Sequence, residues 1–181
     1  MKKIGIAGIG GIGSNIAVQL LRCGITELTF GDFDVVEESN FNRQFYFREQ
    51  TGRDKVEALA ENLLKICPTG IFNYERIKFS EDNIKDYFKD CQIVIEGFDN
   101  NLYKKMLVEE LLPLGKTIIS ASGIAGPFCK NVKIRKITDN FYVVGDFVND
   151  IKDHKIFGYK VMVTSSLMTE IALRESGYFE R

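Results

Sequence analysis

Residues 3–14 read KIGIAGIGGIGS, an apolar run that leads directly into a glycine-rich turn and then into the start of a helix. Gly8, Gly10 and Gly13 fit the spacing G-x-G-x-x-G, in which the glycines allow a tight turn, close approach of a phosphate and packing of the helix on the strand. The free N–H groups at the start of such a helix face the phosphate. We therefore expect nucleotide binding here rather than a turn with only a structural role.

The rest of the chain continues this alternation of strand and helix, as judged from the periodicity of its apolar residues. The expected strands cover residues 2–7, 27–31, 71–77, 92–97 and 117–121, and the expected helices cover residues 14–23, 54–66, 81–88, 101–112 and 161–173. Residues 131–136 and 141–144 are expected to pair around a turn. This order predicts one domain over residues 1–181 with a Rossmann-like α/β fold. Its sheet should be largely parallel, with helices on both faces and a C-terminal antiparallel strand pair.

Composition narrows the classes of function. The 181 residues are 45% hydrophobic and 27% charged, with a net charge of −1, which is ordinary for a globular protein and favours neither nucleic acid nor a membrane as partner. No apolar run has the length of a membrane span and no signal peptide precedes the first strand, so the cytoplasm is the expected location. The four cysteines form no C-x-x-C pair and only one histidine is present, so we expect no zinc.

Charged side chains gather near the expected carboxyl ends of the strands. Asp32 ends the second strand nineteen residues after Gly13. A carboxylate there accepts hydrogen bonds from ribose hydroxyls, which fits both NAD and an adenosine nucleotide. Asp34 could serve the nucleotide or cap the next segment. Arg43 and Lys55 add two cations, and these favour a triphosphate, because backbone groups suffice for the pyrophosphate of a dinucleotide.

Asp99 and Asn100 follow a strand that is apolar apart from Glu96. They should stand beside the ligand crevice, because ligands of open α/β sheets bind at the carboxyl ends of the strands. A carboxylate in that place can coordinate Mg²⁺ that bridges phosphate oxygens. Aspartate and asparagine are also favoured helix N-caps, and the two roles are compatible.

The motifs together resemble those of the ThiF/MoeB/HesA superfamily, adenylating enzymes related to ubiquitin-activating enzymes. The resemblance covers about residues 3–126 and rests on GIGGIGS at 8–14, DFD at 32–34, SNFNRQ at 39–44, GRDK at 52–55 and DN at 99–100. The segments ASGIAG at 121–126 and GDFV at 145–148 are similar to the short ThiF-type proteins of thiamine biosynthesis.

The resemblance implies an adenylyltransferase. A ubiquitin-like sulfur carrier of the ThiS type would present a C-terminal Gly-Gly, whose carboxylate attacks the α-phosphate of ATP, and the enzyme would be a homodimer. Carried over to this sequence, the residues that would act on phosphates or Mg²⁺ are Arg43, Lys55 and Asp99, with Asp99 as the metal ligand. Those that would bind the nucleotide are Gly8, Gly10, Gly11, Gly13, Asp32, Asp34, Ser39, Asn40, Asn42, Gln44 and Asn100.

We expect this chain to lack two features of longer superfamily members, namely an N-terminal helical extension with an arginine and two zinc-binding C-x-x-C pairs. The short ThiF-type branch resembles it in lacking both. Cys129 lies in the loop 126–130. We expect it to be an incidental loop cysteine rather than one that forms a persulfide or a thioester. Two other readings stay open at this point: an NAD-dependent oxidoreductase, and an inactive nucleotide-binding scaffold for a ubiquitin-like partner.

Overall fold

The computed structural model describes residues 1–150 and 152–180. Within these residues one sheet contains seven strands: β1 (Ile4–Ala7), β2 (Glu27–Asp32), β3 (Ile71–Arg76), β4 (Ile93–Glu96), β5 (Thr117–Ala121), β6 (Lys133–Thr138) and β7 (Phe141–Gly145). The α-helices are α1 (Gly11–Arg22), α2 (Lys55–Ile66), α3 (Ile84–Tyr87), α4 (Asn101–Leu111) and α5 (Gly158–Glu175).

The strand order is β3-β2-β1-β4-β5-β7-β6. All neighbours are parallel except β6 and β7, which pair antiparallel. Strand β1 lies between β2 and β4, so the chain reverses its direction of growth across the sheet at this strand, and ligands of open α/β sheets bind at such a point. The predicted Rossmann-like fold with a C-terminal antiparallel pair is confirmed.

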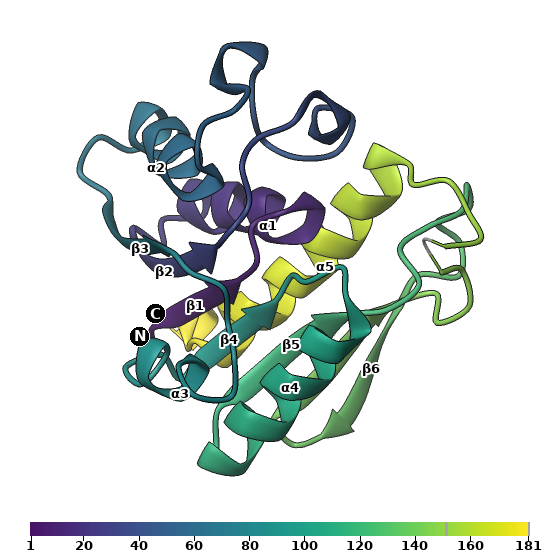
Figure 1. Ribbon diagram of the computed structural model, residues 1–181. Coiled ribbons are helices and arrows are strands. Elements are labelled where there is room, and N and C mark those ends of the chain that lie inside the picture. Colours follow the sequence, from purple (N-terminus) through teal and green to yellow (C-terminus); the bar gives the residue numbers. More distant parts are fainter. Residues whose placement is uncertain (151, 181) are drawn as a thin grey trace.

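Helices cover both faces of the sheet (Figure 1), and each face has its own apolar core. The larger core joins the sheet to α1, α2 and α5, and the smaller one joins it to α3 and α4. Strand β1 serves both, because successive side chains point to opposite faces. Ile4 and Ile6 belong to the larger core, whereas Ala7 belongs to the smaller one. The apolar strands of the sequence are therefore buried on both sides, as is usual in parallel sheets.

The element boundaries differ from expectation mainly at the helices. Helix α1 begins at Gly11, three residues before the expected start, even though glycine is a poor helix former. The helix expected over 81–88 is reduced to one turn, and α5 extends beyond the expected 161–173 at both ends. The polar connection after β2 contains two 3-10 turns, Glu38–Asn40 and Arg48–Gln50. In the described part of the chain, no helix has the length and apolar character needed to cross a membrane.

Candidate nucleotide site

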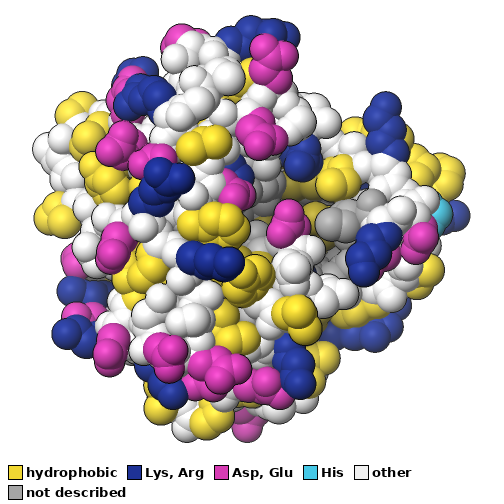
Figure 2. All heavy atoms as spheres, in the orientation of Figure 1, with side chains coloured by type: hydrophobic (Ala, Val, Ile, Leu, Met, Phe, Trp, Pro, Cys, Tyr) yellow, Lys and Arg dark blue, Asp and Glu magenta, His cyan; other side chains and the backbone are white. Residues whose placement is uncertain are grey.

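A cavity of about 810 Å³ lies at the carboxyl ends of β1, β2, β4 and β5. The surface in Figure 2 is hollowed near the middle of the view, with acidic and basic side chains around the hollow. Many of the residues expected at a nucleotide site line this cavity together: Gly8, Gly10, Gly11, Asp32, Asp34, Arg43, Gln44, Lys55, Asp99 and Asn100. Segments that are far apart in the sequence thus form one site.

The glycine-rich turn forms the wall of the cavity at the carboxyl end of β1. Gly8 has a φ of +83°, which side chains disfavour, and its N–H donates to the carbonyl of Gly31 in β2. Gly13 does not line the cavity. A Cβ on Gly13 would lie 2.1 Å from the Gly8 oxygen, so its role is to let α1 pack closely on the turn. Helix α1 has no side-chain cap, which leaves its first N–H groups available to an anion.

Asp32 ends β2 with its carboxylate almost entirely buried. Its two oxygens accept hydrogen bonds from the N–H groups of Ile9 (2.8 Å) and Asp34 (2.9 Å), which fix the carboxylate beside the glycine-rich turn. Burial raises the pKa of Asp32, and the positive charge of Lys55 and these two N–H donors oppose the rise. Each oxygen keeps a lone pair for a further donor, such as a ribose hydroxyl.

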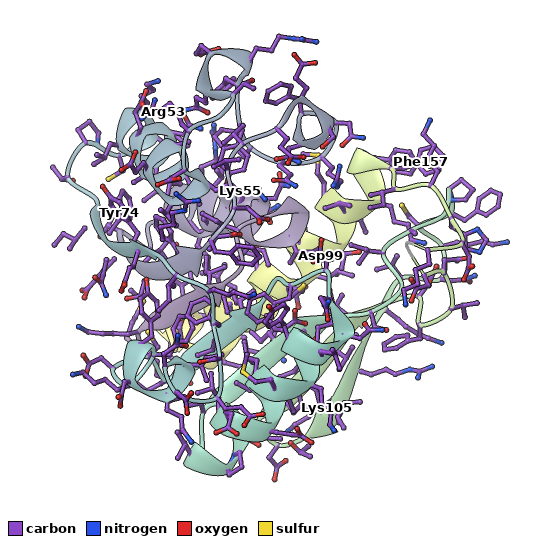
Figure 3. The ribbon with its side chains drawn as sticks, in the orientation of Figure 1. Arg53, Lys55, Tyr74, Asp99, Lys105 and Phe157 are labelled. Atoms are coloured by element: carbon purple, nitrogen blue, oxygen red, sulfur yellow. The ribbon has the colours of Figure 1, made fainter. Side chains whose placement is uncertain are left out.

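Lys55 begins α2 and reaches the cavity as a buried cation. Its ammonium lies 2.9 Å from a carboxylate oxygen of Asp34, and the Lys55 side chain is only 6% exposed. Figure 3 labels Lys55 and Asp99, which come to the site from different elements, the start of α2 and the loop after β4. A phosphate in the cavity would share Lys55 with Asp34, because an ammonium has three donors.

Of the 39–44 stretch, only Arg43 and Gln44 line the cavity. Arg43 donates from Nη1 to the carbonyl of Ser39 and to the side-chain oxygen of Asn42, both at 2.8 Å, so these two residues position the guanidinium. Asn40 is buried, and its side-chain oxygen accepts the Glu37 N–H at 3.0 Å. Ser39, Asn40 and Asn42 thus shape the loop. The side-chain oxygen of Gln44 is buried and has no hydrogen-bond partner among the described residues.

The loop between β4 and α4 brings Asp99 and Asn100 to the site, as expected. Asn100 is the N-cap of α4, and its side-chain oxygen accepts the Leu102 N–H at 2.8 Å. Asp99 is exposed at the cavity. Nowhere in residues 1–150 and 152–180 do three His, Cys, Asp or Glu side chains gather into a ready-made metal site. A lone carboxylate still fits Mg²⁺, which usually takes one or two carboxylates together with phosphate oxygens.

Sequence reasoning missed a second group of residues, at the ends of β4 and β5. Glu96 is fully buried, and both of its oxygens accept from the ammonium of Lys104, at 2.9 and 2.8 Å. Glu96 also accepts from the hydroxyl of Ser120 and, at 2.7 Å, from the Phe98 N–H. Lys104 and Ser120 line the cavity. One signal in the sequence was available, because Glu96 is the single charge in an apolar strand.

The far wall comes from the segment that follows β7, which includes the cavity residues Asn149 and Asp150. A buried ion pair anchors it. The ammonium of Lys160 in α5 lies 2.6 Å from Asp146, and the two side chains are 0% and 2% exposed. Burial opposes the charge on Asp146, but the Asn149 and Val148 N–H groups, the Asn149 amide and Lys160 hold its pKa well below the usual range. Cys129, by contrast, does not line the cavity.

Comparison with known proteins gives this geometry a family context. A sequence profile described as the ThiF family matches residues 1–143. Ubiquitin-like modifier-activating enzyme 5 of Aedes aegypti is 30% identical over 155 residues, covering 84% of this chain and 36% of that protein. The adenylyltransferase and sulfurtransferase uba4 of Aspergillus clavatus is 31% identical over 123 residues, covering 67% of this chain and 25% of that protein. The chain therefore spans about a third or less of these relatives.

Solved structures share the fold. Escherichia coli tRNA N6-threonylcarbamoyladenosine dehydratase, TcdA, solved with AMP, superposes with a TM-score of 0.86 at 20% identity, covering 96% of this chain and 85% of the other. Escherichia coli MccB, solved with ATP, gives a TM-score of 0.73 at 18% identity, covering 96% and 55%. At these identities the likeness concerns the fold alone.

Proposed function

Because this chain belongs to the ThiF family, we propose that it is an ATP-dependent adenylyltransferase acting on the C-terminal Gly-Gly of a ubiquitin-like sulfur carrier. The observation that carries the proposal is a single cavity lined by the glycine-rich turn, Asp32, Arg43, Lys55 and Asp99. Nucleotide-binding and cationic groups meet there, as activation of a carboxylate by ATP requires. The short ThiF-type segments favour a ThiS-like carrier and a role in synthesis of the thiamine thiazole.

The reaction is a displacement at phosphorus. A carboxylate oxygen of the carrier attacks the α-phosphorus of ATP, the bond from that phosphorus to the bridging oxygen breaks, and pyrophosphate leaves with the electron pair. The product is an acyl-adenylate. No general base is needed, because the carboxylate is ionised at neutral pH. The protein's contribution is therefore orientation and stabilisation of charge.

Each part of the cavity has a task in this scheme. The N–H groups at the start of α1 face the phosphates, and Asp32 accepts from the ribose hydroxyls. Arg43 and Lys55 oppose the negative charge on the phosphates, with Ser39 and Asn42 holding Arg43 in place. Asp99 would hold Mg²⁺ against the phosphates, and the metal supplies further neutralisation of charge.

Pyrophosphate exchange tests the proposal. Incubation with ATP, Mg²⁺, labelled pyrophosphate and a ThiS-type carrier ending in Gly-Gly should return label to ATP, and omission of the carrier should abolish this. Exchange that fails with the carrier although ATP binds would favour the inactive-scaffold reading. The family also suggests a homodimer, and a mass from light scattering equal to one chain would contradict that part.

A further inference from the structure

The cavity has a half that the nucleotide leaves free. A nucleotide with its ribose at Asp32, its phosphates at the glycine-rich turn and its Mg²⁺ at Asp99 would occupy the ends of β1 and β2 and the loop after β4. The remaining wall, at the ends of β4 and β5, is lined by Lys104, Ser120 and Ser122. The second reactant of an adenylation must lie in this half, since it has to reach the α-phosphate.

The ammonium of Lys104 makes two short hydrogen bonds and one longer one. Glu96 takes two of its three N–H donors at 2.9 and 2.8 Å, while the third meets the carbonyl of Ala121 at a longer 3.3 Å. The Lys104 side chain is 24% exposed, whereas Glu96 is 0% exposed. Replacing a buried ion pair by apolar residues often costs no stability. A contribution to stability alone therefore does not explain why Glu96 and Lys104 are paired here.

We propose that Lys104 binds the acceptor carboxylate and that Glu96 is its positioning residue. The inference rests on the proposed adenylation and names the residue that receives the second substrate. An anionic oxygen accepts a stronger hydrogen bond than the Ala121 carbonyl, so it would take the third donor of Lys104. Glu96 neutralises much of the ammonium charge. The carboxylate is therefore oriented without being bound so tightly in the ground state that its attack is slowed.

The test compares two carriers and a matched set of variants. The carriers are a ThiS-type protein ending in Gly-Gly and the same protein with its terminal carboxylate converted to an amide. The double variant Glu96→Gln/Lys104→Met removes the pair without leaving a buried charge unpaired. Lys105→Met is the control, because Lys105, labelled in Figure 3, is the next residue on α4. It pairs with Glu109, and both side chains are exposed.

Carrier binding is measured by calorimetry with α,β-methylene-ATP present. We expect wild type and Lys105→Met to prefer the carboxylate carrier over the amide carrier by about tenfold or more, the size of a hydrogen bond to a charged group. The double variant should bind both carriers equally, bind ATP within about twofold of wild type, and show a KM for the carrier raised by about tenfold or more in exchange, on the same grounds.

Several results would overturn the inference: no preference for the carboxylate in wild type, an unchanged preference in the double variant, or a parallel loss of ATP affinity. Absence of exchange in wild type refutes the adenylation instead, while the binding preference still reports on Lys104. If the double variant melts at a much lower temperature, Glu96→Gln/Lys104→Gln replaces it. This variant keeps two polar side chains that can hydrogen-bond to each other, removes both charges, and should lose the preference as well.

Discussion

Replacing Lys160 by methionine should destabilise the fold strongly, because it leaves the carboxylate of Asp146 buried without its cation. Breaking a buried pair by removing one partner costs about 3–5 kcal/mol. The lower end applies here, because the N–H groups of Val148 and Asn149 still donate to Asp146 at 2.9 Å. Lys160 also donates to the Ala125 carbonyl, and that loss adds about 1 kcal/mol. The sum is about 4 kcal/mol, which lowers the Tm by about 8–16 °C for a chain of this size.

Thermal and urea denaturation followed by circular dichroism measure this cost. Two further variants serve as comparisons for the cost of Lys160→Met. Asp146→Asn/Lys160→Met removes both charges and should recover part of the loss, whereas Lys136→Met removes a solvent-exposed pair with Asp139 and should leave the Tm nearly unchanged. If Lys160→Met lowered the free energy of unfolding by less than about 1 kcal/mol, the reasoning would be refuted, since a buried carboxylate without a cation carries a larger free-energy cost than that.

The pH dependence of the free energy of unfolding provides a second test of the Asp146–Lys160 pair. The pKa of Asp146 is depressed in the folded state, so its contribution is fully present above the unfolded-state pKa of about 3.9 and is lost as pH falls toward the folded-state value. Wild type should therefore lose stability steadily below about pH 4. In Lys160→Met the depression is smaller, so the loss over this range should be smaller too. A steeper acid loss in the variant would contradict this assignment.

Three further predictions concern the reaction. Calorimetric titration should show binding of ATP with Mg²⁺ and none of NAD; tight NAD binding without ATP binding would end the adenylation proposal. Asp99→Ala should abolish pyrophosphate exchange and leave the circular dichroism spectrum unchanged, because a metal ligand contributes several kcal/mol at the phosphates; a wild-type rate of exchange in this variant would show that Asp99 holds no metal. Cys129→Ser should keep normal exchange, because no thiol acts before the acyl-adenylate forms. Loss of thiocarboxylate production alone in that variant would assign Cys129 to sulfur transfer.

The fold could be predicted because its signals are local. Strands β1, β4 and β5 are buried and mostly apolar runs, and the longer helices have their own periodicity. The order and type of these elements therefore followed from short windows of sequence. The start of α1 was missed because Gly11 and Gly13 are poor helix formers. Tertiary packing overrides that preference, since Gly13 lets the helix lie against the Gly8 carbonyl.

One part of the site could be predicted because a residue's place follows from the end of a strand. Asp32 and Asp99 line the cavity for this reason. The amides of the 39–44 stretch looked like ligands, but Asn40 satisfies the backbone of its own loop, a choice that composition does not reveal. Glu96 and Ser120 are 24 residues apart and meet only because β4 and β5 pair. Contacts made by strand pairing leave no mark in a single sequence.

The central place of β1 has a consequence for synthesis on the ribosome. Strand β1 pairs with β4, whose residues are synthesised some ninety positions later. The glycine-rich turn also depends on that late partner, because the Gly97 N–H donates to the Ala7 carbonyl at 2.8 Å. Helix α1 also packs in the larger core with α5, which is synthesised after β4. A nascent chain therefore cannot hold a nucleotide at this turn before β4 and α5 have been made.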